Sequence, residues 1–218
     1  MESAPAAKRG RPPTASRAEV LRLARSQYLD GQRVDLTVVA RRLGLGRATI
    51  YRWFGSRDAL LGDVIASELE QLVAAHRKNV RQRGATGLLK VFDRVNRSLS
   101  SSRALRALLE RERDGALRLL TSSAGPVQPR AVAAVQALID DEVRAGRYKS
   151  PADPGALAYA IVRLAEAFLY NDAAIGIRGD WGRLHQVEAA LLGVAPTGAR
   201  TRPPTRRAVS VARGRSGS

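Results

Sequence analysis

The chain has 218 residues, of which 44% are hydrophobic and 26% are charged, and it contains no cysteine. This apolar fraction suffices for a buried core, which excludes a wholly disordered protein, and the lack of cysteine excludes disulfide bonds and thiolate chemistry. The formal net charge of +17 indicates a polyanionic partner, and nucleic acid and an anionic membrane surface both qualify at this point.

The positive charge is concentrated near the two ends of the chain. The net charge is +3 over residues 1–17, +4 over 18–62, +4 over the much longer span 63–195, and +6 over 196–218. We therefore expect a basic arm over 1–15, a basic first domain over 16–62, a nearly balanced domain over 63–195 and a basic tail over 196–218. Both ends are rich in Pro, Arg, Ser and Gly, a composition typical of disorder.

The N-terminal arm contains the segment KRGRPP, which resembles the Arg-Gly-Arg-Pro core of an AT-hook. Arg9 and Arg11 would enter the DNA minor groove, where the intervening glycine allows close backbone approach. The alternative is a flexible linker that adds only electrostatic affinity. The arm has no apolar stretch typical of a secretory signal, and no run of eighteen apolar residues follows, so we expect a cytoplasmic protein without a membrane partner.

Residues 16–62 carry the signals of four successive helix starts. Ser16 and Glu19 form a capping box, Thr37 is the expected N-cap of a second helix, and Ser56 is the expected N-cap of a fourth. The segment GLG from Gly44 separates the second helix from a short third helix over 47–54.

Two short helices joined by a glycine-containing turn have the spacing of a helix-turn-helix, whose second helix enters the DNA major groove. Ile50 and Phe54 are four residues apart and are expected to face inward. The residues expected on the outward face are Arg47, Ala48, Thr49, Tyr51 and Arg52. Arginine reads guanine and small side chains contact thymine, while Thr37, Tyr51 and Arg57 suit phosphates. The alternative is a small amphipathic helix with solvated arginines.

The remainder of the chain also reads as helices, which makes the protein all-α with about nine helices. Helical patterns continue to about residue 81 and then cover 86–100, 102–121, 126–145, 153–175 and 181–193. The acidic run Asp140, Asp141 and Glu142 is expected to be solvated surface. His76 and His185 have no second ligand at helical spacing, and no phosphate-loop, dinucleotide or nucleophile-elbow motif occurs. We therefore expect no metal, no cofactor and no enzymatic activity.

The segment LTVVARRLGLGRATIYRWFGSRDALLGDVI resembles the TetR family of bacterial transcriptional regulators. The resemblance covers about residues 16–65 and implies a homodimer that binds a palindromic double-stranded DNA operator and releases it when a small-molecule effector binds. Trp53 stands where the family usually has His, which makes it either a hydrophobic wedge or a phosphate donor through its indole N–H. Gly46 stands where the family commonly has a Ser or Thr cap.

The helix from about Asp153 carries a polar and aromatic face formed by Tyr159, Arg163, Glu166 and Tyr170. By resemblance, this face would line the effector pocket of a larger ligand-binding and dimerisation domain. The alternative is that Arg163 and Glu166 form an ion pair within or between subunits. The segment IVRLAEAFLY also resembles the family branch that controls quorum-signal lactone degradation, which implies a lactone-like ligand.

A second interpretation is a ligand-independent, architectural DNA-binding protein that relies on its basic arms. A nearly neutral helical domain of this size argues against it, because an architectural protein has no need of one.

Overall fold

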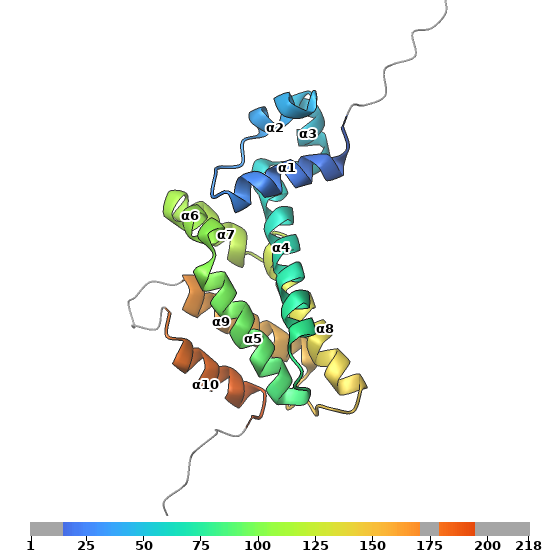
Figure 1. The fold of residues 1–218 in the computed structure, drawn as a ribbon, viewed down its shortest axis with the longest axis vertical. Helices are drawn as coiled ribbons and strands as arrows, with labels where there is room; N and C mark the ends of the chain where they lie inside the picture. The colour runs from blue at the N-terminus through green and yellow to red at the C-terminus, as the bar shows by residue number, and fades with distance from the viewer. Residues whose placement is uncertain (1–14, 171–178, 195–218) are drawn as a thin grey trace, which may run out of the picture.

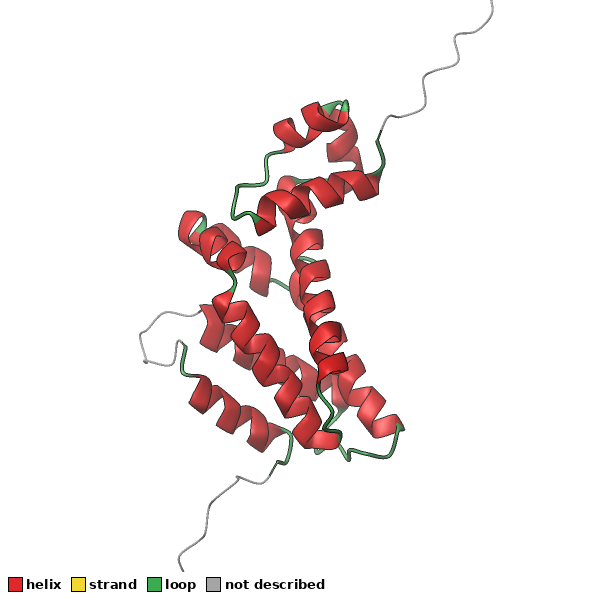
Figure 2. Ribbon diagram, in the orientation of Figure 1, coloured by secondary structure: helices red, strands yellow, loops and turns green. Residues whose placement is uncertain are grey.

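The computed structural model describes residues 15–170 and 179–194, and within these ranges the chain is helical with no strand (Figure 2). The first four helices are α1 (Arg17–Leu29), α2 (Leu36–Leu43), α3 (Arg47–Phe54) and α4 (Arg57–Asn79). The following ones are α5 (Gly84–Ser101), α6 (Arg103–Arg111), α7 (Arg113–Thr121), α8 (Val127–Arg144), α9 (Pro154–Tyr170) and α10 (Trp181–Leu191). No helix among the described residues is long and apolar enough to cross a membrane. The all-α prediction is confirmed.

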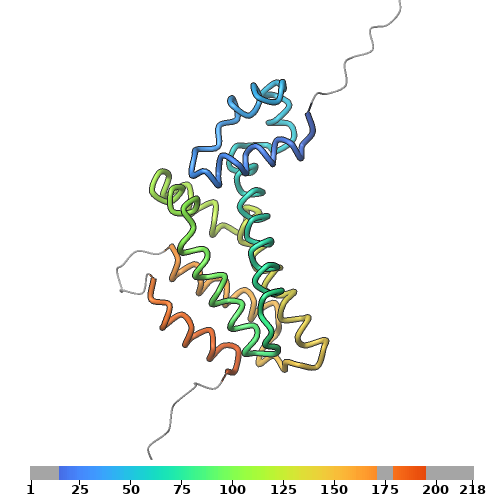
Figure 3. Tube along the Cα trace, in the orientation of Figure 1, coloured from blue at the N-terminus to red at the C-terminus, as the bar shows by residue number. Residues whose placement is uncertain are grey.

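Helices α1, α2 and α3 gather at one end of the molecule, which we call the head, and α5 to α10 form the body (Figure 1). Helix α4 belongs to both parts, since its 23 residues start beneath α3 and run down between α5 and α8 (Figure 3). The expected domain boundary between residues 62 and 63 therefore falls inside a continuous helix.

Local capping signals explain how the head helices start and stop. Ser16 and Glu19 form the predicted capping box, and Ser56 Oγ accepts a hydrogen bond of 3.0 Å from the backbone N–H of Ala59. Gly44 ends α2 with φ of 63°, a left-handed conformation that glycine adopts without a steric penalty.

The predicted N-cap Thr37 is wrong, because Asp35 occupies that position. The Asp35 carboxylate accepts hydrogen bonds from the backbone N–H groups of Thr37, at 2.7 Å, and Val38, at 3.3 Å. Starting the helix two residues earlier also allows Leu36 to be buried in the head. Aspartate caps at least as well as threonine, and the added burial favours the earlier start.

The predicted helix over 102–121 is divided in two at Glu112, so the described residues hold ten helices rather than about nine. Glu112 adopts φ of −139° and ψ of 49°, outside the helical region. Its carboxylate lies against arginines of the head, a tertiary contact that local helical periodicity cannot reveal.

Two buried apolar clusters stabilise the fold. The first is built from the head, the upper part of α4 and the inner faces of α6 and α7. The second is built from the lower part of α4 together with α5, α8, α9 and α10. The head is thus packed directly onto α6 and α7.

The expectation that the acidic run is solvated is wrong for Glu142, whose side chain is 2% exposed. Its carboxylate accepts hydrogen bonds from Arg77, from Arg147 at 2.8 Å and from the backbone N–H of Gly84 at 2.8 Å. The bonds from Arg147 lower the pKa of Glu142 most, and the Gly84 N–H and Arg77 add to them against the opposing effect of burial. Glu142 thereby joins α4, α5 and α8 at the end of the body far from the head.

Candidate nucleic-acid interface and ligand cavity

Helix α3 presents one buried face and one exposed face. Ile50 is 0% exposed and Phe54 is 7% exposed, and both belong to the buried cluster of the head. The side chains of Arg47, Ala48, Tyr51 and Arg52 are exposed, and Thr49 is half-buried. The inward and outward positions predicted from the spacing are therefore the observed ones except for Thr49, which is only partly exposed.

Ring contacts order two arginines at the edge of this face. The Arg47 guanidinium lies over the Tyr51 ring, with its carbon 5.9 Å from the ring centroid, and that of Arg17 lies 4.6 Å from the centroid of Phe54. Such contacts hold a cationic group in place while its N–H donors stay available. The first turn of α3 has no side-chain cap, because Gly46 is its N-cap.

Two further expected DNA-contacting residues lie in different settings. Thr37 is exposed in the first turn of α2. Trp53 is half-buried and packs against the head cluster, which favours an anchoring role for its ring. Arg9 and Arg11 lie outside the described residues.

Arg57 does not lie on the exposed face, and its expected phosphate contact needs correction. Its guanidinium donates two hydrogen bonds to the Glu112 carboxylate, at 2.8 and 2.9 Å, and its Nε donates to the carbonyl of Val34 at 3.0 Å. The Arg57 side chain is only 19% exposed. Because Ser56 starts α4 directly beneath α3, the next side chain points into the junction of head and body.

Glu112 also accepts a hydrogen bond from Arg33 at 3.1 Å. Burial opposes ionisation of this carboxyl, but the two arginines outweigh burial and hold its pKa below the ordinary value. Beside it, Arg111 donates to the carbonyl of Gly31. These contacts, which we call the junction, attach the α6–α7 break to both ends of the α1–α2 loop and to the start of α4.

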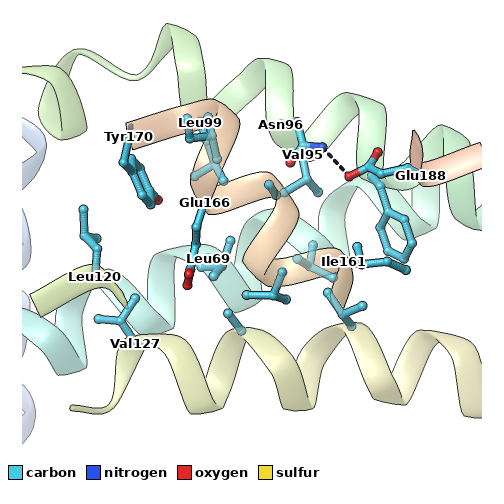
Figure 4. A pocket seen from close by; sticks show the side chains of 17 residues that line it. Leu69, Val95, Asn96, Leu99, Leu120, Val127, Ile161, Glu166, Tyr170 and Glu188 are labelled. Atoms are coloured by element: carbon cyan, nitrogen blue, oxygen red, sulfur yellow. Dashed lines mark hydrogen bonds between the residues drawn. The ribbon is translucent and has the colours of Figure 1, made fainter. Parts of the chain in front are cut away.

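The body encloses a cavity between α4, α5, α7, α8, α9 and α10 (Figure 4). Its empty volume is about 610 Å³, including the part that opens to solvent, and most of its wall is aliphatic. A second cavity adjoins it toward the head and is bordered by Tyr28 of α1. The two cavities share wall residues, among them Leu69 and Tyr170.

Of the four predicted ligand-contacting residues, Glu166 and Tyr170 line the cavity, whereas Tyr159 and Arg163 do not. Tyr159 is 52% exposed, because α9 lines the cavity with the neighbouring face that carries Ile161, Val162 and Ala165, and Tyr159 and Arg163 project beside that face toward solvent. Arg163 donates to Glu166 at 2.8 Å and to the carbonyl of Thr121 at 3.1 Å. The intrahelical ion pair is thus present, and it sits at the edge of the cavity.

Two cavity residues were not predicted, Asn96 of α5 and Glu188 of α10. Glu188 is completely buried, and its Oε1 accepts a hydrogen bond of 3.0 Å from Asn96 Nδ2. Burial, aided by the charge of Asp93, raises the pKa of Glu188 to about 8 against the opposing bond from Asn96. A signal existed in the sequence, because Glu188 shares a helical face with the buried Leu184 and Leu192.

The chain is similar to one family model and to several solved structures. A family model described as the tetracyclin repressor-like, C-terminal domain matches residues 83–193. The R. erythropolis transcriptional repressor QsdR from the TetR family is 32% identical, with a TM-score of 0.75 over 84% of this chain and 96% of that chain. The TetR family repressor AlkX from Dietzia sp. strain DQ12-45-1b has the same fold, at 24% identity and a TM-score of 0.59, over 83% of this chain and 97% of that chain. No curated protein matches the chain at a significant level.

Proposed function

Because this chain belongs to the TetR family of transcriptional regulators, we propose that it is a ligand-responsive repressor that binds a palindromic operator as a homodimer. A small molecule that enters the body cavity would release the operator. DNA binding and regulation of transcription follow from the family, and the ligand, the symmetry and the sign of regulation are our proposal. It places the protein in the cytoplasm, with its DNA target.

The observation that carries the proposal is the exposed face of α3 at the tip of the head. In our proposal Arg47 and Arg52 contact base edges in the major groove, and Ala48 and Thr49 contact thymine methyl groups. Tyr51 and Thr37 contact phosphates and set the position of the helix without reading sequence. Arg9 and Arg11 would add a minor-groove contact from the arm.

The adjoining cavities support a route by which a ligand influences the head. Tyr170 lines the first cavity and also borders the second, which reaches Tyr28 on α1. A ligand that displaces Tyr170 would therefore press on the helix that packs beneath α3. Glu166, one turn earlier on α9, lines the same cavity and would also contact the ligand.

Exposed apolar side chains support a dimer interface on α9 and α10. Tyr159 is 52% exposed and Val187 is 42% exposed, although both are large and apolar. Pairing of these helices with those of a second copy would bury them.

Selection of binding sites from random DNA tests the proposal. We expect an inverted repeat, relaxed preference at one position per half-site in Arg47→Ala, and relaxed preference at a different position in Arg52→Ala, each at a cost of about 1–3 kcal/mol. Arg97→Ala is the matched control, because Arg97 is an exposed arginine on α5 of the body.

Recovery of sequences without an inverted repeat would contradict the dimeric repressor. An equal loss of affinity on all sequences in Arg47→Ala and Arg52→Ala would instead assign both side chains to phosphates.

A further inference from the structure

The cavity of the body holds a carboxyl group whose hydrogen-bonding capacity is only half used. Glu188 is 0% exposed, its Oε1 accepts from Asn96, and its Oε2 has no hydrogen-bond partner among the described residues. A buried polar oxygen without a partner is unfavourable, and native proteins rarely retain one without a function. Glu188 enters the cavity from α10 and Asn96 from α5 (Figure 4).

A second carboxyl group lines the same cavity. Glu166 reaches it from α9, and burial raises its pKa despite the Arg163 guanidinium beside it. The remaining polar groups of the wall are the Tyr170 hydroxyl and the Asn96 amide, and the described lining contains no Lys, Arg or His. A carboxylate or phosphate ligand would therefore meet two acidic groups and no cation of the wall, because Arg163 lies at the edge of the cavity and is already paired with Glu166.

The groups around Glu188 also favour a ligand that donates hydrogen bonds. Asp93 on α5 lies close enough to raise the pKa of Glu188, and His185 Nδ1 lies 2.9 Å from the Asp93 carboxylate. Asn96 offers its N–H group to Glu188, so its carbonyl oxygen remains as an acceptor. The site thus offers acceptors, surrounded by aliphatic side chains such as Val95, Ile161 and Leu69.

We propose that the cavity binds a lipophilic amine, whose ammonium group donates to Glu188 Oε2 while its hydrocarbon part lies against the aliphatic wall. This rests on the proposed ligand-responsive function and specifies its ligand class. Binding transfers the proton of the neutral Glu188 carboxyl to solvent, because the ammonium stabilises the carboxylate form. A desolvated pair of this kind is favourable only with good hydrogen-bond geometry, which Asn96 supports by holding Oε1.

Isothermal titration with four ten-carbon probes tests this: decylammonium, decan-1-ol, γ-decalactone and decanoate, the two ionic ones below their micellar concentration and the two neutral ones below their solubility limit. We expect decylammonium to bind at least about tenfold more tightly than decanol and the lactone, and decanoate to bind most weakly. Tighter binding of the lactone would overturn the proposal in favour of a neutral Glu188 that donates to a carbonyl.

Glu188→Gln keeps the shape and the bond from Asn96 but cannot form the carboxylate that the ammonium needs. We expect this variant to lose the preference for the amine while its affinity for decanol stays within about twofold. Glu110→Gln is the matched control, because Glu110 is exposed on α6 and does not line the cavity. A preference for the amine that survives in Glu188→Gln would overturn the assignment.

Proton release on ligand binding can be measured with the unaltered protein, so this test does not depend on a variant. Titration of the unaltered protein at pH 7 in two buffers of different ionisation enthalpy should show about one proton released per decylammonium bound and none with decanol. No release with the amine would overturn the proposal.

Operator binding, measured separately, distinguishes this inference from the proposed function. If decylammonium binds with proton release but leaves operator affinity unchanged, the ligand-responsive function fails and the amine site stands. If decanol or the lactone releases the operator and decylammonium does not bind, the function stands and the amine site fails.

Discussion

Glu142 and Glu188 are both buried carboxyls of the body, yet their surroundings shift their pKa values in opposite directions. Glu142 lies among Arg77, Arg147 and the Gly84 N–H, and its pKa is lowered. Glu188 has one amide donor and the nearby charge of Asp93, and its pKa is raised to about 8. Burial is common to the two, so the number of donors decides which form is stable.

The lowered pKa of Glu142 gives its contribution to stability a definite pH dependence. A carboxyl with a folded-state pKa below its unfolded value stabilises the fold above the unfolded value, about 4.5, and this contribution is lost as the pH falls through the folded-state pKa. Glu142→Gln should lower the free energy of unfolding by about 3 kcal/mol at pH 7, because it leaves two arginines without their buried partner. Urea denaturation at pH 7 and at pH 3 should show the difference from wild type shrinking at the lower pH.

Asp141→Asn provides the control for this measurement. Asp141 is the neighbouring residue, and its ion pair with Arg144 is solvent-exposed. We expect a change below about 0.5 kcal/mol at either pH. An equal effect of the two substitutions would show that overall charge, and not the buried contacts of Glu142, determines the loss.

At the scale of the helices, Gly62 allows α4 to approach the start of α8 closely. A Cβ atom at Gly62 would lie 2.8 Å from Cγ of Pro126 and 3.3 Å from Cδ1 of Leu119. The proline ring cannot rotate away, so a larger side chain would force the two helices apart.

Gly62→Ala should therefore destabilise the protein, although alanine favours a helix by about 1 kcal/mol over glycine, because overpacking costs about 1–3 kcal/mol. Gly115→Ala is the matched control: Gly115 lies within α7, and a Cβ there would meet nothing within 4 Å. Thermal unfolding should show a lower Tm for Gly62→Ala and a higher Tm for Gly115→Ala. A higher Tm for both would mean that α4 and α8 can separate without loss.

The sequence predicted those helix features that depend on local chemistry. Ser16, Gly44 and Ser56 act through neighbours within four residues, and so their roles were readable. The break at Glu112 was missed, because its partner Arg57 lies 55 residues away.

The functional sites show the same contrast between features set by local sequence and features set by tertiary packing. The inward and outward faces of α3 come from its own periodicity, whereas the cavity is assembled from six helices. Tyr159 and Arg163 were expected on the cavity face of α9 but lie beside it, because packing decides which face of the helix borders the cavity. Glu188 carried a local signal, a carboxyl within an apolar stripe, but its partner Asn96 did not.

On the scale of the whole molecule, the junction around Glu112 attaches the head to the body. Arg57→Ala should lower the free energy of unfolding by about 2 kcal/mol, because it removes the charged hydrogen bonds to Glu112. A double-mutant cycle with Glu112→Gln, with Arg97→Ala as an unrelated arginine, would measure the coupling.

Arg57→Ala also distinguishes a role of Arg57 in attaching the head to the body from a role in binding DNA. The salt dependence of operator affinity should keep its slope in Arg57→Ala, whereas loss of a phosphate-contacting cation lowers that slope by about 1. A lower slope in Arg57→Ala would restore the phosphate contact first expected for it.

The length of α4 determines how far the head moves when this helix tilts in the proposed ligand response. At 1.5 Å per residue its 23 residues span about 35 Å, so a tilt of about 6° about the end at Asn79 moves the end beneath α3 by about 3.6 Å. That displacement equals about one base-pair step along DNA, whose phosphates on one strand recur every 3.4 Å or so. A rotation small enough to leave the side-chain packing of the body intact would thus misalign the head with its target by a full step. Because α4 is long, a tilt of a few degrees is sufficient for the proposed release of the operator.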